Sequence, residues 1–159
     1  MKTRHERGRG RGTMVVRLSG GLVRARIRPR PRTPPPGIID RVELPTITAS
    51  ELQKKIEVGD TFVLVDALAP MVYAHSHLPG AMNLPPSAVD RERLARRIPD
   101  RDLEIIVYCA NSDCDDSVRT AEHLVALGYT NVRHYAGGKN EWRDLGFPLE
   151  RAGKPYVPR

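Results

Sequence analysis

Cysteine is scarce in this chain of 159 residues, which holds only Cys109 and Cys114. Two cysteines do not make the disulfide framework of a small secreted domain, and no Cys or His cluster supplies the four ligands of a structural zinc site. No apolar run approaches the roughly 20 residues that span a bilayer, and no apolar signal-peptide segment follows the basic N-terminus. We therefore expect no membrane span and a cytoplasmic location, although an Arg-rich N-terminus is also compatible with organelle import.

Aromatic residues are absent from residues 1–40, and acidic residues are nearly so. This segment carries eleven Lys or Arg residues against Glu6 and Asp40, a net charge of +9, and the rest of the chain carries −2 of the overall +7. Five prolines within residues 29–36 favour an extended chain over a helix or central strand. Charge alone can attract nucleic acid, but without aromatics to stack bases we expect a disordered tail with no specific nucleic-acid partner.

Helix-like and strand-like segments alternate over residues 46–150. Thr48 and Glu51 have the spacing of a capping box, and Gly59 supplies the stop of that first helix. Continuous apolar runs predict strands buried on both faces. The other expected elements are strands over 62–65, 103–108 and 131–135, a short helix broken near Pro70, and helices over 87–98, 117–127 and from Gly138. This order predicts an α/β domain with a parallel sheet covered by helices on both faces, followed by a tail over 151–159.

Cys109 follows directly after the apolar run that ends at Tyr108. Reactive groups of open α/β sheets lie beyond the carboxyl ends of the strands, and the helix expected from Ser117 directs its N-terminal amides toward the same loop. Such amides stabilise an anion and lower the pKa of a cysteine. The residues alone therefore leave two interpretations about equal: a reactive thiolate, or a small buried hydrophobic residue.

Four segments, in this order, resemble the rhodanese-like family. They are the phrase HLPGAMNLP at 77–85, the sequence VYC at 107–109 with its loop and Ser117, the helical segment 120–129, and the closing Gly137, Gly138, Trp142, Gly146 and Pro148. The resemblance spans about residues 47–150. It implies a five-stranded parallel sheet and a cysteine, by position Cys109, that carries sulfane sulfur as a persulfide with no cofactor or metal.

The loop after Cys109 reaches its serine about two residues later than the usual family loop, and it lacks the Arg and Gly often found there. Its three aspartates repel an anionic donor such as thiosulfate, so a small persulfide or a persulfidated protein is the expected sulfur donor. The residues expected to bind substrate are Ala110, Asn111, Ser112, Asp113, Cys114, Asp115, Asp116 and Ser117. Asp115 or Asp116 is expected to cap the following helix, and Arg119 to offset part of the negative charge.

Cys114 has three possible roles. It can resolve a persulfide or sulfenate on Cys109 by forming a disulfide, it can be the nucleophile itself, or it can be incidental. Asp66 and His77 are expected to support the site by hydrogen bonding at the reactive edge of the sheet. His75 and His77 lack a third partner, so no metal site is expected.

The leading hypothesis is a single-domain sulfurtransferase in which Cys109 takes sulfur from a donor and passes it to a nucleophilic acceptor. One alternative is a non-enzymatic redox-sensing or interaction module that uses Cys109 and Cys114. A phosphatase-like or arsenate-reductase-like activity is disfavoured because the loop lacks an Arg. The sequence leaves the acceptor, the oligomeric state and the purpose of the tail open.

Overall fold

The computed structural model describes residues 14–18, 21–25, 43–151 and 154–156. The chain divides into two units, residues 1–40 and 41–159. In the first unit, strands β1 (Met14–Leu18) and β2 (Gly21–Ala25) pair as an antiparallel hairpin. These ten residues differ from the disorder that composition predicts, and the rest of the expected tail lies outside the described residues.

A parallel sheet with the strand order β4-β3-β5-β6 forms the centre of the second unit. Its strands are β3 (Val63–Asp66), β4 (Met82–Asn83), β5 (Ile105–Tyr108) and β6 (Val132–Tyr135). The expectation of five strands is wrong for the described residues, where the sheet has four and only a single parallel bridge, Thr46 to His134, extends it beyond β6. Pro45 has no N–H to donate, and Thr48 already caps the first helix, which leaves no room for a longer strand.

Helix α1 (Ala49–Val58) begins and ends as the sequence predicts. The backbone N–H of Glu51 donates to the Thr48 hydroxyl at 3.3 Å, and the Thr48 N–H donates to the Glu51 carboxylate at 2.9 Å. This reciprocal pair satisfies two amides that a helix start leaves unpaired. Gly59 closes the helix in the left-handed region with φ 68°, which glycine adopts without a Cβ clash.

Two other helices differ from their expected positions. Helix α2 (Pro70–His75) begins at Pro70 rather than breaking there, because a proline at the first helical position loses no intrahelical bond. The single helix expected over 87–98 is instead a 3₁₀ turn, η1 (Pro86–Ala88), followed by α3 (Arg91–Arg97). Asp90 caps α3 by accepting from the Arg93 N–H at 2.8 Å.

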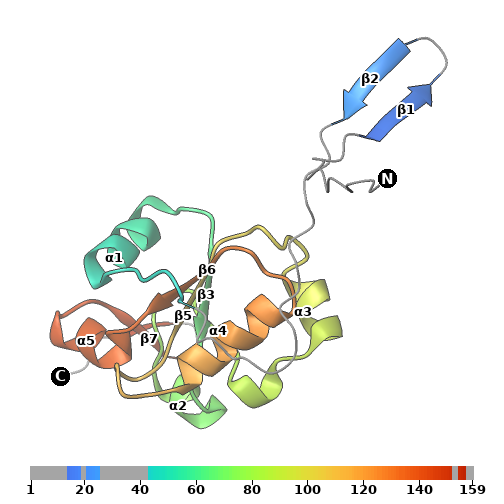
Figure 1. Cartoon of the computed structure of the whole chain (residues 1–159). Coiled ribbons are helices and arrows are strands. Elements are labelled where there is room, and N and C mark those ends of the chain that lie inside the picture. Colours follow the sequence, from blue (N-terminus) through green and yellow to red (C-terminus); the bar gives the residue numbers. More distant parts are fainter. Residues whose placement is uncertain (1–13, 19–20, 26–42, 152–153, 157–159) are drawn as a thin grey trace, which may run out of the picture. The chain divides into compact units, whose positions relative to one another are not determined.

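Helices cover both faces of the sheet, as predicted (Figure 1). On one face, α1 and α5 (Gly138–Asp144) pack on a core built around Leu52, Ile106, Tyr108 and Trp142. On the other face, α3 and α4 (Asp116–Ala126) pack on a second core. Its fully buried members include Val65, Ile105, Val107, Leu94, Ala121 and Leu124. Alternate residues of β5 thus enter opposite layers, which fixes the direction of every side chain at its carboxyl end.

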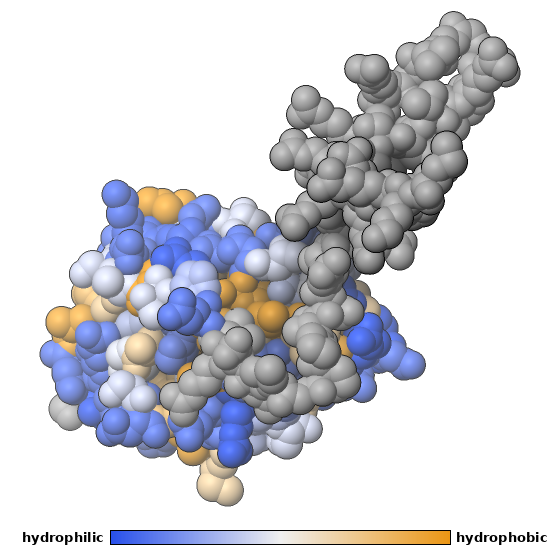
Figure 2. Space-filling view, in the orientation of Figure 1, coloured by the Kyte–Doolittle hydropathy of each residue, from blue (hydrophilic) through white to orange (hydrophobic). Residues whose placement is uncertain are grey.

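A short antiparallel pair, β7 (Leu149–Arg151) and β8 (Lys154–Tyr156), follows α5. The visible face of the second unit is mostly hydrophilic, with scattered apolar residues (Figure 2). The large apolar side chains exposed in the described part are Val58, Met71, Val72 and Leu145. Within that same part, none of the helices has both the length and the apolar composition needed to cross a bilayer.

Candidate active site

Cys109 lies where the sequence places it, directly after β5 and before the loop that leads into α4. The start of α5 holds this segment from the other side. Lys139 donates its backbone N–H to the carbonyl of Cys109, and Asn140 donates to that of Ala110, each at 2.9 Å. The cysteine is therefore held between the end of β5 and the start of α5, and the residue is 1% exposed.

The sulfur of Cys109 contacts carbonyl oxygens of its own loop. Its Sγ lies 3.3 Å from the carbonyl oxygen of Asn111 and 3.2 Å from that of Cys114. A carbonyl accepts a hydrogen bond from a thiol and repels a thiolate, so this arrangement suits the protonated form. The loop amides expected to surround the sulfur are partly used within the loop, where Cys114 N–H donates to the Asn111 carbonyl at 3.3 Å.

Burial raises the pKa of Cys109 to about 11, which reverses the prediction of a lowered pKa. The thiol of Cys114 beside it raises the pKa further. The hydroxyl and backbone N–H of Ser117 act in the opposite direction, as expected for the first turn of a helix. The sequence thus predicted the helix contribution correctly, but it could not show that desolvation outweighs it.

Ser117 links the cysteine to a histidine that the sequence analysis missed. Its Oγ donates to Cys109 Sγ at 3.1 Å and lies 2.9 Å from Nε2 of His134. His134 is on β6, and burial lowers the pKa of its ring. Strand alternation was the available signal, because His134 shares the face of the buried Val132, which packs toward α4.

The remaining loop residues lie nearer the surface. Cys114 is half-buried, and both cysteines are free thiols. Asp113 and Asp115 are exposed. Asp115 occupies the N-cap position of α4, but its side chain makes no capping hydrogen bond, so the expected capping role is not observed. Arg119 is exposed in the first turns of α4.

Removing the Cys114 thiol is expected to lower the pKa of Cys109. The Cys114 side chain raises that pKa, so Cys114→Ala leaves a larger thiolate fraction at any pH below about 11. The check is the pH dependence of alkylation of Cys109 by iodoacetamide, followed by peptide mass spectrometry. Ser117→Ala is the matched control, because it removes a group that lowers the pKa and must shift the profile the other way. An unchanged profile in Cys114→Ala would contradict the prediction.

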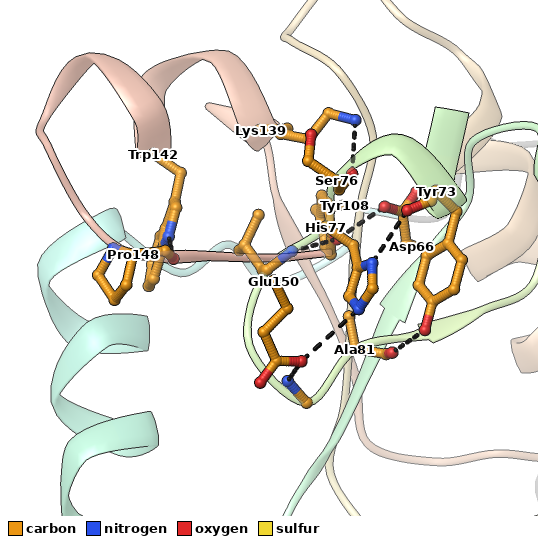
Figure 3. A network of polar contacts seen from close by, with 12 residues as sticks. Asp66, Tyr73, Ser76, His77, Ala81, Tyr108, Lys139, Trp142, Pro148 and Glu150 are labelled. Carbon is orange, nitrogen blue, oxygen red and sulfur yellow. Dashed lines mark hydrogen bonds and ion pairs between the residues drawn. The ribbon is translucent and has the colours of Figure 1, made fainter. Parts of the chain in front are cut away.

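Asp66 anchors a buried polar network beside β5 (Figure 3). Its carboxylate accepts from the Tyr108 hydroxyl at 2.7 Å and from the Leu68 N–H at 2.9 Å. The Tyr108 oxygen in turn accepts from the Leu78 N–H at 3.0 Å, which ties the 76–85 turn to the central strand. Burial raises the pKa of Asp66, and these hydrogen bonds oppose that rise. Asp66 thus supports the turn, and no direct bond between its side chain and the Cys109 loop is present among the described residues.

His77 orders the same turn. Its Nδ1 donates to the Tyr73 carbonyl at 2.9 Å, its ring stacks on that of Tyr73 with centroids 3.9 Å apart, and its Nε2 lies 3.6 Å from the Glu150 carboxylate. Lys139 lies close by and donates its ammonium to the Ser76 carbonyl at 2.9 Å. Both ring nitrogens of His77 therefore contact groups that hold the turn in place.

Comparison with known proteins matches residues 48–145 to the family model described as the rhodanese-like domain. The HTH-type transcriptional regulator Rv0324 of Mycobacterium tuberculosis is 35% identical over 107 residues, covering 65% of this chain and 44% of its own length. The thiosulfate sulfurtransferase PspE of Escherichia coli is 34% identical over 76 residues, covering 48% of this chain and 70% of its own.

A solved structure of a thiosulfate sulfurtransferase from Pseudomonas aeruginosa superposes with a TM-score of 0.60 at 25% identity, covering 73% of this chain and 22% of that one. The chain spans less than half the length of the first curated relatives it matches, such as Rv0324 and, at 23%, the thiosulfate sulfurtransferase YnjE of Escherichia coli. The matched model covers well over half of the chain and includes β3 to β6 and the cysteine loop. The chain belongs to the rhodanese-like family.

Proposed function

We propose that this protein is a sulfurtransferase that carries sulfane sulfur as a persulfide on Cys109. The observation that carries the proposal is the position of this sulfur, at the carboxyl end of the central strand and within 3.1 Å of the Ser117 hydroxyl at the start of α4. Relatives at about one-third identity bear the name thiosulfate sulfurtransferase, which supports the same class of reaction.

The reaction has two displacements at sulfur. The Cys109 thiolate attacks the outer sulfur of a donor R–S–SH, a new S–S bond forms on the cysteine, and the donor's own S–S bond breaks with release of the thiolate RS⁻. A nucleophilic acceptor then attacks the outer sulfur of the persulfide. That step regenerates the Cys109 thiolate and completes the transfer.

Two steps must precede the first displacement. Cys109 is 1% exposed, so the loop at 110–116 has to move before a donor can reach the sulfur. The raised pKa, about 11, means that the resting group is a thiol, so a proton must also leave. Opening the loop rehydrates the sulfur and removes carbonyl contacts, and both changes favour the thiolate.

The donor we propose is a low-molecular-weight or protein persulfide rather than thiosulfate. Asp113, Asp115 and Asp116 give the loop three carboxylates and no Lys or Arg. Like charges repel a thiosulfate dianion, whereas a persulfide brings at most one negative charge.

The test is intact-mass spectrometry of the full chain after incubation with thiosulfate and, separately, with cysteine persulfide. We expect a gain of about 32 Da, one sulfur atom, with the persulfide and much less with thiosulfate. Peptide mapping should place the gain on the peptide that holds Cys109. Absence of loading from both donors would refute the proposal, and equal loading would refute the choice of donor.

A second candidate function is thiol redox sensing by Cys109 and Cys114. It is favoured by one observation: the Cys114 thiol is close enough to raise the pKa of Cys109. Attack of a Cys114 thiolate on the inner sulfur of a Cys109 persulfide forms a disulfide and releases hydrosulfide, with no further oxidant. In that case the disulfide, and not transferred sulfur, would be the lasting product after incubation with a persulfide.

A further inference from the structure

We propose that His134 is a positioning residue that, through Ser117, takes up the proton of the Cys109 thiol. One hydroxyl oxygen joins the two groups: Ser117 Oγ lies 3.1 Å from Cys109 Sγ and 2.9 Å from His134 Nε2. Ser117 itself is fully buried, so bulk water does not compete for its hydroxyl. This inference rests on the proposed function only for the identity of the reaction that the proton transfer serves.

The transfer balances without any outside base. In the structure the Cys109 S–H donates to loop carbonyls and the Ser117 hydroxyl donates to the sulfur, so both hydrogens first turn, the S–H toward Ser117 Oγ and the hydroxyl toward Nε2 of His134. The S–H proton then moves to Oγ while the hydroxyl proton moves to Nε2, which leaves a thiolate and an imidazolium. Ser117 then donates to the thiolate, and this is the direction of the hydrogen bond found in the structure. When a donor thiolate RS⁻ leaves, the same path returns the proton, and the product departs as the thiol RSH.

The backbone of His134 is held by hydrogen bonds that do not involve its side chain. The His134 N–H donates to the Pro45 carbonyl at 2.8 Å, and its carbonyl accepts from the Ile47 N–H at 3.1 Å. On the inner side, His134 pairs in register with Val107 of β5. A substitution of the side chain keeps all of these contacts, so a variant at this position can fold.

The other ionisable side chains of β6 bind residues other than Ser117. Arg133 pairs with Glu104 at 3.3 Å and also donates to the Thr46 carbonyl, and the Tyr135 hydroxyl donates to Glu141 at 2.8 Å. The ionisable residues of the loop itself are Cys114, Asp113, Asp115 and Asp116, all of them acids. Of these groups, His134 is the one whose ring nitrogen lies within hydrogen-bond distance of Ser117 Oγ, which makes it the group placed to take up the proton of Cys109.

The deciding variant is His134→Gln, which retains a side-chain hydrogen bond to Ser117 but has no basic nitrogen. At pH 7.5 we expect two reactions of Cys109 to slow at least about tenfold: its loading by cysteine persulfide and its alkylation by iodoacetamide. This is less than the rate enhancement that a general acid–base group typically provides. The deficit should shrink as the pH rises toward 10, because hydroxide replaces the missing base. A purely structural role predicts the same deficit at every pH.

His123→Gln is the matched control, since it makes the same change at an exposed histidine of α4 and should leave both rates unchanged. Thermal denaturation of each variant reports whether it folds. If His134→Gln reacts at the wild-type rates, or if its deficit does not depend on pH, the relay is overturned while the sulfurtransferase proposal stands. If the wild type takes up no sulfur but its alkylation depends on His134, the relay stands and the sulfurtransferase proposal falls.

Discussion

Cys109→Ser is expected to reduce sulfur loading to background, a loss on the order of 10³-fold or more, as is typical when an attacking nucleophile is removed. A serine hydroxyl at this position is almost entirely protonated at neutral pH and cannot form a persulfide. The substitution replaces one buried small side chain with another, so the fold should persist. The measurement is single-turnover loading from cysteine persulfide, read as the mass gain of the intact chain.

Cys114→Ser is the matched variant, since it makes the same chemical change five residues away on the half-buried thiol. If Cys109 is the nucleophile, Cys114→Ser still takes up one sulfur. If Cys114 resolves the persulfide, Cys114→Ser also keeps that sulfur longer than the wild type does. The reverse result, with loading lost in Cys114→Ser and retained in Cys109→Ser, would make Cys114 the nucleophile and end the assignment made here.

The central elements were predictable because local rules and tertiary packing agree on them. Thr48 and Glu51 mark the start of α1 by side-chain capping and Gly59 marks its end by a left-handed backbone, and the structure contains each of these features. The continuous apolar runs before Asp66 and Cys109 predict strands covered on both faces, and β3 and β5 are buried in that way. The position of Cys109 at the end of β5 follows directly from the same pattern.

The surroundings of the sulfur were not predictable from spacing. Sequence shows that a loop and a helix start follow Cys109, but not whether the loop directs amides or carbonyls at the sulfur. Here the carbonyls of Asn111 and Cys114 face it, and desolvation raises its pKa to about 11. His134 belongs to no motif of the sequence, and it reaches Ser117 only because β6 pairs with β5 in this register.

These contacts describe a protected resting state. A buried thiol that donates to carbonyls is a poor nucleophile and is also resistant to oxidation, because both reactions need an exposed thiolate. In the proposed reaction, opening of the 110–116 loop would control access and acidity together. The proposed sulfur transfer therefore predicts that reaction with a donor depends on the donor, or an associated partner, stabilising the open loop.

Gly138→Ala is expected to destabilise the second unit by at least about 3 kcal/mol, more than the roughly 1–2 kcal/mol that left-handed backbone costs a residue with a Cβ. Gly138 has φ +63°, and an added Cβ would lie 2.5 Å from the carbonyl oxygen of Cys109 and 2.8 Å from the carbonyl carbon of Ala110. These are backbone atoms, which cannot rotate away as a flexible side chain can. The strain is therefore relieved only by moving the start of α5 away from the cysteine.

The rate of sulfur loading by Gly138→Ala should consequently fall about 100-fold even in the molecules that remain folded. A displacement of a reacting group by about 1 Å is enough to slow a reaction by this factor. Gly59→Ala is the control, because Gly59 has nearly the same φ, +68°, but no heavy atom within 4 Å of the added Cβ. Urea denaturation gives the two free energies of unfolding, and single-turnover loading gives the two rates. Gly59→Ala should lose only the roughly 1–2 kcal/mol of stability that a left-handed backbone costs a residue with a Cβ, and it should load sulfur at the wild-type rate. Equal stability and equal loading in the two variants would mean that the close contact between α5 and Cys109 does not set the geometry of the sulfur.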